Sequence, residues 1–226
     1  MKRIITIIAL GLAAAVMSAQ TPKNVRYVFT EASDLNLIGK IIEGTPNPYH
    51  RVDTVKYKGF TKGENQKVRY SAGLAVLFKT NSTTISVKSV YGVCNAPTAN
   101  TMIASQGFDL YIKDGKDWKY AASGVNEESK KNANRVLIKN MDGKEKECML
   151  YLPMYSEMYS VKIGIQEGAY IEALESPFRH RIGIFGSSFT HGASATRPGM
   201  SYPMQLMRWT GLQFLNLGCS GVGKLQ

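Results

Sequence analysis

Cysteine and histidine are scarce in this chain of 226 residues, which contains three of each. No two of the cysteines, Cys94, Cys148 and Cys219, form a Cys-x-x-Cys element, and none has a histidine at metal-ligand spacing. Zinc sites need three or four such ligands, so we expect no metal site and no cofactor. Three cysteines allow at most one disulfide within the chain, and the pairing of Cys94 with Cys148 is left open.

Long hydrophobic runs are missing except at the N-terminus. There a largely apolar stretch, residues 4–17, follows Lys2 and Arg3 and leads into small residues that end at Ala19. The stretch is shorter than the ~20 apolar residues of a membrane-spanning helix. Its order of positive, apolar and small residues is typical of a secretory signal. We therefore expect residues 1–19 to be a signal peptide cleaved near Ala19, and the mature protein to be periplasmic or secreted, without membrane association.

Acidic residues are outnumbered, with 17 Asp and Glu against 28 Lys and Arg and a formal net charge of +11. Such a balance could suit nucleic acid or an anionic polysaccharide. The lysines are scattered over expected turns and solvent-facing strand positions, however, and no block of five basic residues occurs. No aromatic nucleic-acid-binding motif accompanies them. We expect a solvated basic surface and no nucleic-acid partner.

Helix-length amphipathic periodicity is missing from residues 24–176, where short apolar segments alternate with turn residues. Four turns each separate two strand-like segments: Asn81-Ser82, Asp114-Gly115, Asp142-Gly143 and Gln166-Glu-Gly168. Asp-Gly accepts the backbone angles of a two-residue hairpin turn, and we expect a hairpin at each of the four. The region is therefore predicted to be an antiparallel β-sandwich, jelly-roll-like in its number of strands.

The pattern changes at Pro177, which cannot donate a hydrogen bond to a sheet. Beyond it, residues 181–186 and 212–217 are apolar and strand-like, and cap residues mark a short helix between them, over Ser201–Gly211. Strand, helix and strand in this order predict a parallel βαβ unit. We expect residues 179–226 to be the start of an α/β domain.

A serine-containing turn follows the first of these strands. Gly186 and Gly192 flank it, and Ser188 lies at the carboxyl end of the strand, where open α/β sheets bind ligands. Gly221 follows the second strand, so loops from neighbouring strands could place its amide beside Ser188. A serine hydroxyl and preorganised amides are components of a nucleophilic acyl-transfer site. The alternative is that Ser188 only caps a turn and that Gly221 is an ordinary turn residue.

Three motifs resemble those of known families. Gly186-Ser-Ser-Phe-Thr190 resembles the Gly-Asp-Ser-Ile/Leu-Thr block that opens the SGNH (GDSL-type) hydrolases, and Gly218-Cys-Ser-Gly221 resembles their second block. Gly107-Phe-Asp-Leu-Tyr111 resembles the GxDLY signature of a β-sandwich domain that precedes certain bacterial SGNH esterases. The resemblance implies a flavodoxin-like three-layer α/β domain and an esterase that deacylates carbohydrate. It also implies that Ser188 is the nucleophile and that the Ser188 and Gly221 amides stabilise the oxyanion.

Two features depart from the pattern of the SGNH hydrolases. Ser187 stands where aspartate is commoner, which is taken as variation within the family. The third block, Gly-x-Asn-Asp, and the final Asp-x-x-His have no counterpart in the sequence. Residues 179–226 are also too few to bury both faces of a parallel sheet. We therefore expect the sequence to be a fragment or a prematurely ended form of a longer hydrolase, inactive by itself.

Three histidines are candidates for the base that this pattern lacks. His191 follows Ser188 by three residues, but a loop histidine in a polar niche is the favoured interpretation. His50 and His180 are expected to be structural or solvent-facing.

A noncatalytic carbohydrate-binding module is the second function left open. Exposed aromatic side chains could stack on sugar rings, the candidates being Trp118, Tyr120, Tyr155 and Tyr159. Aromatic residues in strands are more often buried, which favours core packing for at least half of them. In the esterase interpretation, the partner is an acylated carbohydrate or another small ester.

Overall fold

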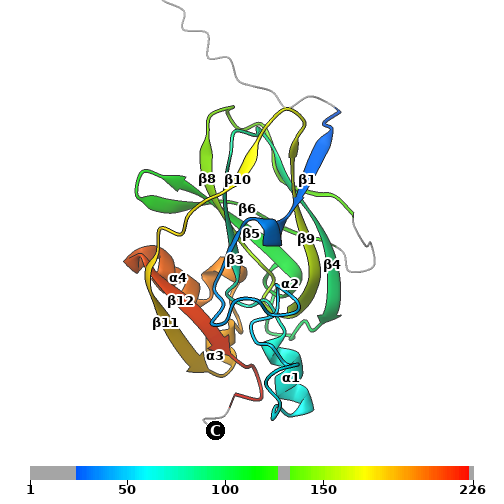
Figure 1. Ribbon diagram of the computed structural model, residues 1–226, viewed down its shortest axis with the longest axis vertical. Coiled ribbons are helices and arrows are strands. Elements are labelled where there is room, and N and C mark those ends of the chain that lie inside the picture. Colours follow the sequence, from blue (N-terminus) through cyan, green and yellow to red (C-terminus); the bar gives the residue numbers. More distant parts are fainter. Residues whose placement is uncertain (1–23, 127–132, 224–226) are drawn as a thin grey trace, which may run out of the picture.

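The computed structural model describes residues 24–126 and 133–223, so the expected signal peptide lies outside the described residues. Two antiparallel sheets are stacked on each other, and a parallel βαβ unit packs beside them (Figure 1). The predicted combination of a β-sandwich with the first unit of an α/β domain is confirmed. Within the described ranges, no helix is long and apolar enough to cross a membrane.

The first sheet has the strand order β1-β9-β4-β7, with every neighbouring pair antiparallel. Its strands are β1 (Tyr27–Glu31), β4 (Ile85–Cys94), β7 (Arg135–Ile138) and β9 (Ser156–Gln166). A 3-10 turn, η1 (Ala32–Asp34), follows β1.

The second sheet has the order β10-β3-β8-β5-β6, with β2 also paired to β3. Its strands are β2 (Asn36–Ile38), β3 (Ala75–Thr80), β5 (Gly107–Asp114), β6 (Asp117–Val125), β8 (Lys146–Tyr151) and β10 (Ile171–Ala173). This sheet is the central layer of the molecule. Because successive side chains of a strand point to opposite faces, β3 and β8 contribute to two cores.

One core lies between the two sheets and the other between the second sheet and the βαβ unit. On β3, Val76 and Phe78 belong to the first core, and Ala75 and Leu77 belong to the second. Strands buried on both faces have continuous apolar sequences, as β3 does.

Only one of the four predicted hairpins is confirmed. β5 and β6 pair as a hairpin, with Asp114 opposite Asp117 and Gly115 at φ +60° in the turn. The other three are wrong: β3 and β4, β7 and β8, and β9 and β10 lie in different sheets. In each case the turn carries the chain from one sheet to the other, so the two flanking strands find their partners elsewhere.

Two short helices interrupt the sandwich, where no helix-length run was expected. α1 (Lys62–Val68) begins with a capping box, in which Thr61 and Glu64 satisfy each other's backbone N–H groups. α2 (Met102–Gln106) is capped by the Thr101 hydroxyl, which accepts from the Ala104 N–H at 3.0 Å.

The βαβ unit has the predicted order. β11 (Arg179–Gly186) runs parallel to β12 (Leu212–Gly218), and α4 (Tyr202–Thr210) connects them. Between β11 and α4 lie a short helix, α3 (Ser188–His191), and a 3-10 turn, η2 (Pro198–Met200). Gly211 ends α4 in the left-handed conformation, at φ +70°. Met204 and Met207 are buried against the second sheet.

β11 was expected to be a buried strand, and within the described residues it is largely exposed. Phe185 is 74% exposed. Among the described strands, β11 has only β12 as a neighbour, so its other edge and much of one face have no cover.

The three cysteines are free thiols, so the pairing left open for Cys94 and Cys148 is not formed.

Candidate active site

The carboxyl ends of β11 and β12 lie side by side and carry the two predicted functional loops. The paired register extends to Gly186 opposite Gly218, the last residue of each strand. Beyond it the Cys219 N–H donates to the Gly186 carbonyl at 2.9 Å, which joins the two loops where they leave the sheet.

The first loop turns directly into α3, with Ser188 as its first residue. Ser188 is partly exposed, and its hydroxyl makes no hydrogen bond within the described residues. The helix closes with the Gly192 N–H bonded to the Ser188 carbonyl at 3.0 Å. The turn therefore holds Ser188 by its backbone and leaves its hydroxyl available at the edge of the sheet.

The second loop is a tight turn over residues 219–223. The Val222 and Gly223 N–H groups both donate to the Cys219 carbonyl, at 3.2 and 2.7 Å. Gly221 takes φ +78°, and a side chain at this position would meet no other atom within 4 Å. A Cβ on Gly223, by contrast, would lie 3.1 Å from the Ser187 Cα. The loop that contains Gly221 thus lies against the loop that contains Ser188.

His191 is a buried structural residue, as the favoured interpretation predicted. Its Nε2 lies 2.7 Å from the Met154 carbonyl, and its Nδ1 accepts the Ser220 N–H at 3.2 Å. A carbonyl only accepts, so Nε2 bears the proton. The ring stacks on Tyr155, with centroids 4.3 Å apart.

The surroundings of His191 exclude it as a base for Ser188. Burial, with the nearby Arg51 charge, holds the pKa of His191 well below its ordinary value. The imidazole is therefore neutral near pH 7, and both ring nitrogens already have partners. Its contacts instead join three segments, because the residue itself lies on the first loop, Ser220 on the second and Met154 on the sandwich.

The GxDLY motif, whose role the sequence left open, contacts the connection between α3 and α4. The buried Asp109 carboxylate accepts the Gly199 N–H at 2.9 Å and forms an ion pair with Arg197 at 3.2 Å. The Tyr111 ring lies under the Arg208 guanidinium, 4.2 Å from its centre. Burial raises the pKa of Asp109 to about 6, against the opposing effect of Arg197 and the Gly199 N–H.

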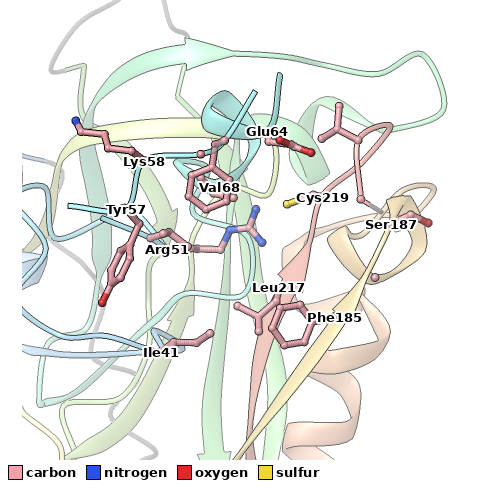
Figure 2. Close-up of a pocket in the computed structure, with 16 residues that line it drawn as sticks. Ile41, Arg51, Tyr57, Lys58, Glu64, Val68, Phe185, Ser187, Leu217 and Cys219 are labelled. Carbon is pink, nitrogen blue, oxygen red and sulfur yellow. The ribbon is translucent and has the colours of Figure 1, made fainter. Parts of the chain in front are cut away.

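A cavity of about 690 Å³ adjoins the two loops (Figure 2). It lies between the ends of β11 and β12 and the segment 41–68 of the sandwich, and Ser187, not Ser188, lines it. Its lining is mainly apolar and includes Ile41, Tyr57, Phe60, Val68, Phe185 and Leu217.

Most of the aromatic residues proposed for sugar stacking have other packing partners. Tyr155 is fully buried, as core packing predicts, and cannot stack on a sugar. Trp118 stacks on Phe178 with centroids 6.4 Å apart, and the Arg197 guanidinium covers the Tyr120 ring at 4.2 Å. Tyr159 is 55% exposed and lies on β9, in the other sheet. These residues do not form one stacking platform.

The remaining histidines lie away from the two loops. The His50 Nε2 lies 2.9 Å from the buried Glu157 carboxylate, so His50 has a structural place in the sandwich. His180 lies on β11 and is exposed, as expected. Within the described ranges, no group of three His, Cys, Asp or Glu side chains could hold a metal ion.

Two family models match successive parts of the chain. Residues 25–171 match the model of the GxDLY domain, described as the N-terminus of SGNH-hydrolase-type esterases. Residues 179–226 match the model of the GDSL-like lipase/acylhydrolase family. No curated protein matches the chain.

Several solved structures share the fold. A protein from Bacteroides ovatus assigned as a GDSL-like lipase is 40% identical with a TM-score of 0.85, over 89% of this chain and 59% of that one. The chain thus spans less than two thirds of that relative. The salicylyl-acyltransferase SsfX3 is 19% identical with a TM-score of 0.64, over 90% of this chain and 56% of that one. A family two carbohydrate esterase from Cellvibrio japonicus is 11% identical with a TM-score of 0.50, over 84% and 52%.

Proposed function

The chain belongs to the SGNH-hydrolase-type esterases that begin with a GxDLY domain, and we propose that its protein is a serine ester hydrolase with Ser188 as nucleophile. The observation that carries the proposal is the contact between the two loops. The Cys219 N–H to Gly186 carbonyl bond brings the segment containing Gly221 against the turn containing Ser188.

In the proposed reaction, the Ser188 hydroxyl oxygen attacks the acyl carbon of an ester while its proton passes to a general base. The carbonyl oxygen becomes an oxyanion, and the Ser188 and Gly221 N–H groups donate to it. Collapse of this intermediate expels the alcohol, which takes a proton, and water then releases the acid from Ser188. Because His191 is excluded as the base, the resemblance assigns this role to the Asp-x-x-His of the family, which residues 1–226 do not contain.

An acylated carbohydrate is the proposed substrate, and acetyl is the proposed acyl group. Support comes from the resemblance to bacterial esterases with an appended sandwich domain. The signal-like residues 1–19 support export of the protein from the cytoplasm. Polysaccharide substrates lie outside the cytoplasm. The carbohydrate-binding alternative has less support, since most of its aromatic candidates pack against neighbours within the protein.

Hydrolysis of nitrophenyl acetate by the full-length protein that contains these residues tests the proposal. Ser188→Ala is expected to abolish turnover and labelling by a fluorophosphonate. Ser187→Ala is the matched control, since this neighbour lies at the same turn but makes no side-chain cap bond. Undiminished hydrolysis by Ser188→Ala would refute the assignment.

A further inference from the structure

Arg51 is a buried cation that contacts the predicted active-site edge from the sandwich. The residue is 2% exposed. Its guanidinium donates to four backbone carbonyls. These are Tyr70 at 2.9 Å, Lys67 at 2.6 Å, Asn216 at 2.8 Å and Gly218 at 2.9 Å.

The four carbonyls come from two separate parts of the molecule. Lys67 and Tyr70 lie at the end of α1 and just beyond it, in the sandwich. Asn216 and Gly218 lie at the end of β12, immediately before the loop 219–223. Figure 2 shows the guanidinium at this junction, pointing toward Cys219. One side chain therefore fixes the end of β12 to a helix more than a hundred residues earlier in the sequence.

The chemistry of this contact requires arginine. A guanidinium presents five N–H donors in a rigid fork, whereas the three donors of a lysine share one nitrogen. The four hydrogen-bond acceptors are backbone carbonyls, and no carboxylate of the described residues forms an ion pair with Arg51. Burial lowers the pKa of its guanidinium, and the neighbouring Cys219 thiol opposes that shift. A buried charge without a counter-ion is costly. The carbonyls at the end of α1 carry partial negative charge and offset part of this cost.

The Arg51 contacts hold the second loop by its beginning, and His191 holds it by the Ser220 N–H. Gly221 comes directly after these two fixed points. An oxyanion donor acts only if its N–H is held where the charge develops, and a displacement of about 1 Å can reduce the rate by about 10²-fold.

We propose that Arg51 is a positioning residue for the Ser188–Gly221 site, through which the sandwich sets the place of the Gly221 amide. The inference rests on the proposed function. It assigns to the N-terminal domain a role in catalysis that acts through the backbone of the second loop.

Steady-state kinetics of Arg51→Lys and Arg51→Gln in the full-length protein test this role. We expect kcat to fall by about 10²-fold with KM nearly unchanged. The Gly221 amide is proposed to stabilise only the transition state, so its displacement would not weaken substrate binding. Arg51→Gln keeps two N–H donors on its amide and removes the buried charge, so this variant remains informative if Arg51→Lys does not fold.

Arg69→Lys is the matched control. Arg69 lies at the same helix end, but it contacts the Asn65 carbonyl and Glu157 and has no contact with β12. Its kcat should equal that of the wild type. Hydrogen exchange adds a readout without substrate: the amides of residues 219–223 should exchange faster in the Arg51 variants, while those of β3 and β8 should not.

The outcomes separate this inference from the proposed function. A folded Arg51 variant that still reacts with the fluorophosphonate at Ser188 but has wild-type kcat would overturn the positioning role. A variant whose kcat/KM falls only through a higher KM would overturn it too. Activity that survives Ser188→Ala would instead overturn the proposed function.

Discussion

Two of the contacts between the sandwich and the βαβ unit differ in chemistry. At the carboxyl ends of the parallel strands, Arg51 and His191 make their hydrogen bonds to backbone groups. At the GxDLY motif, Asp109 and Tyr111 meet the charged side chains of Arg197 and Arg208. The first contact fixes two loops that carry the predicted nucleophile and oxyanion donor. The second holds the connection that leads into α4.

The difference indicates a division of roles. Hydrogen bonds to backbone groups set the path of a loop, so their loss displaces whatever the loop carries. A buried ion pair contributes to docking, but its strength depends on protonation, and the pKa of Asp109 is about 6. We call the contact made by Arg51 and His191 the catalytic edge, and the contact of Asp109 and Tyr111 with Arg197 and Arg208 the GxDLY contact. Changes at the catalytic edge are expected to lower kcat, and changes at the GxDLY contact are expected to lower stability.

The largest expected effect is at His191. His191→Phe keeps an aromatic ring against Tyr155 but removes the bonds to Met154 and Ser220. We expect kcat to fall by about 10²-fold and the free energy of unfolding to fall by about 2 kcal/mol, because buried polar groups lose their partners. Kinetics and urea denaturation measure the two effects. A stable variant with wild-type kcat would remove the distinction between the two contacts.

The next effect concerns pH at Asp109. The unfolded carboxyl loses its proton near the usual pKa of 3.8, whereas the folded one keeps it up to about pH 6. The stability that the protonated group contributes is thus fully present below about pH 4 and is lost as pH rises through 6. Relative to Asp109→Asn, the free energy of unfolding of the wild type should fall by up to about 3 kcal/mol across this window.

Asp117→Asn is the control for the Asp109 experiment, since Asp117 is an exposed carboxylate at the turn between β5 and β6. Relative to Asp117→Asn, the free energy of unfolding of the wild type should not fall between pH 4 and 6. Parallel pH profiles for the wild type and Asp109→Asn would show that Asp109 does not titrate in this range.

A smaller effect is expected from Gly199→Ala. The added Cβ would lie 2.6 Å from the Tyr111 ring and 2.7 Å from the Asp109 carboxylate. Overpacking of this kind costs about 1–3 kcal/mol. Thermal unfolding should show a lower Tm, while kcat at a temperature well below Tm should be unchanged. A kcat that falls as far as in His191→Phe would place the GxDLY contact in the same role as the catalytic edge.

The smallest effect is expected at the start of α1, the helix whose end Arg51 contacts. Thr61→Ala removes one half of the capping box and should cost about 1 kcal/mol, and Thr61→Ser should cost less because it keeps the hydroxyl. Both variants should keep their kcat, since Arg51 binds the other end of the helix. A loss of kcat in Thr61→Ala alone would show that the whole of α1 takes part in positioning.

Much of the βαβ unit could be predicted from sequence because its signals are local. Pro203 and Gly211 mark the ends of α4, and the apolar strands on either side pair in parallel. The same holds for the β5–β6 hairpin at Gly115. The capping box at Thr61 and Glu64 is an equally local signal, and it marks the start of α1.

The sheet to which each strand belongs could not be predicted from the same kind of signal. Asp142-Gly143 has the composition of a hairpin turn, yet it joins β7 in one sheet to β8 in the other. A turn residue needs only suitable backbone angles, and these do not specify whether the next strand pairs with the last one or crosses the core. The apolar residues of β3 and β8 fit the central place of this sheet, since they contribute to both cores.

The roles predicted for Ser188 and Gly221 stay predictions, and the residues around them show where sequence reasoning ends. Residue order alone determined the succession of strands, the βαβ unit and the two loops at its edge, because these depend on neighbours a few positions apart. Only the tertiary structure decided that Arg51 and Met154 meet those loops and that Asp109 meets Arg197. Such contacts join residues far apart in the chain, and they form only after both cores have packed and brought the two parts together.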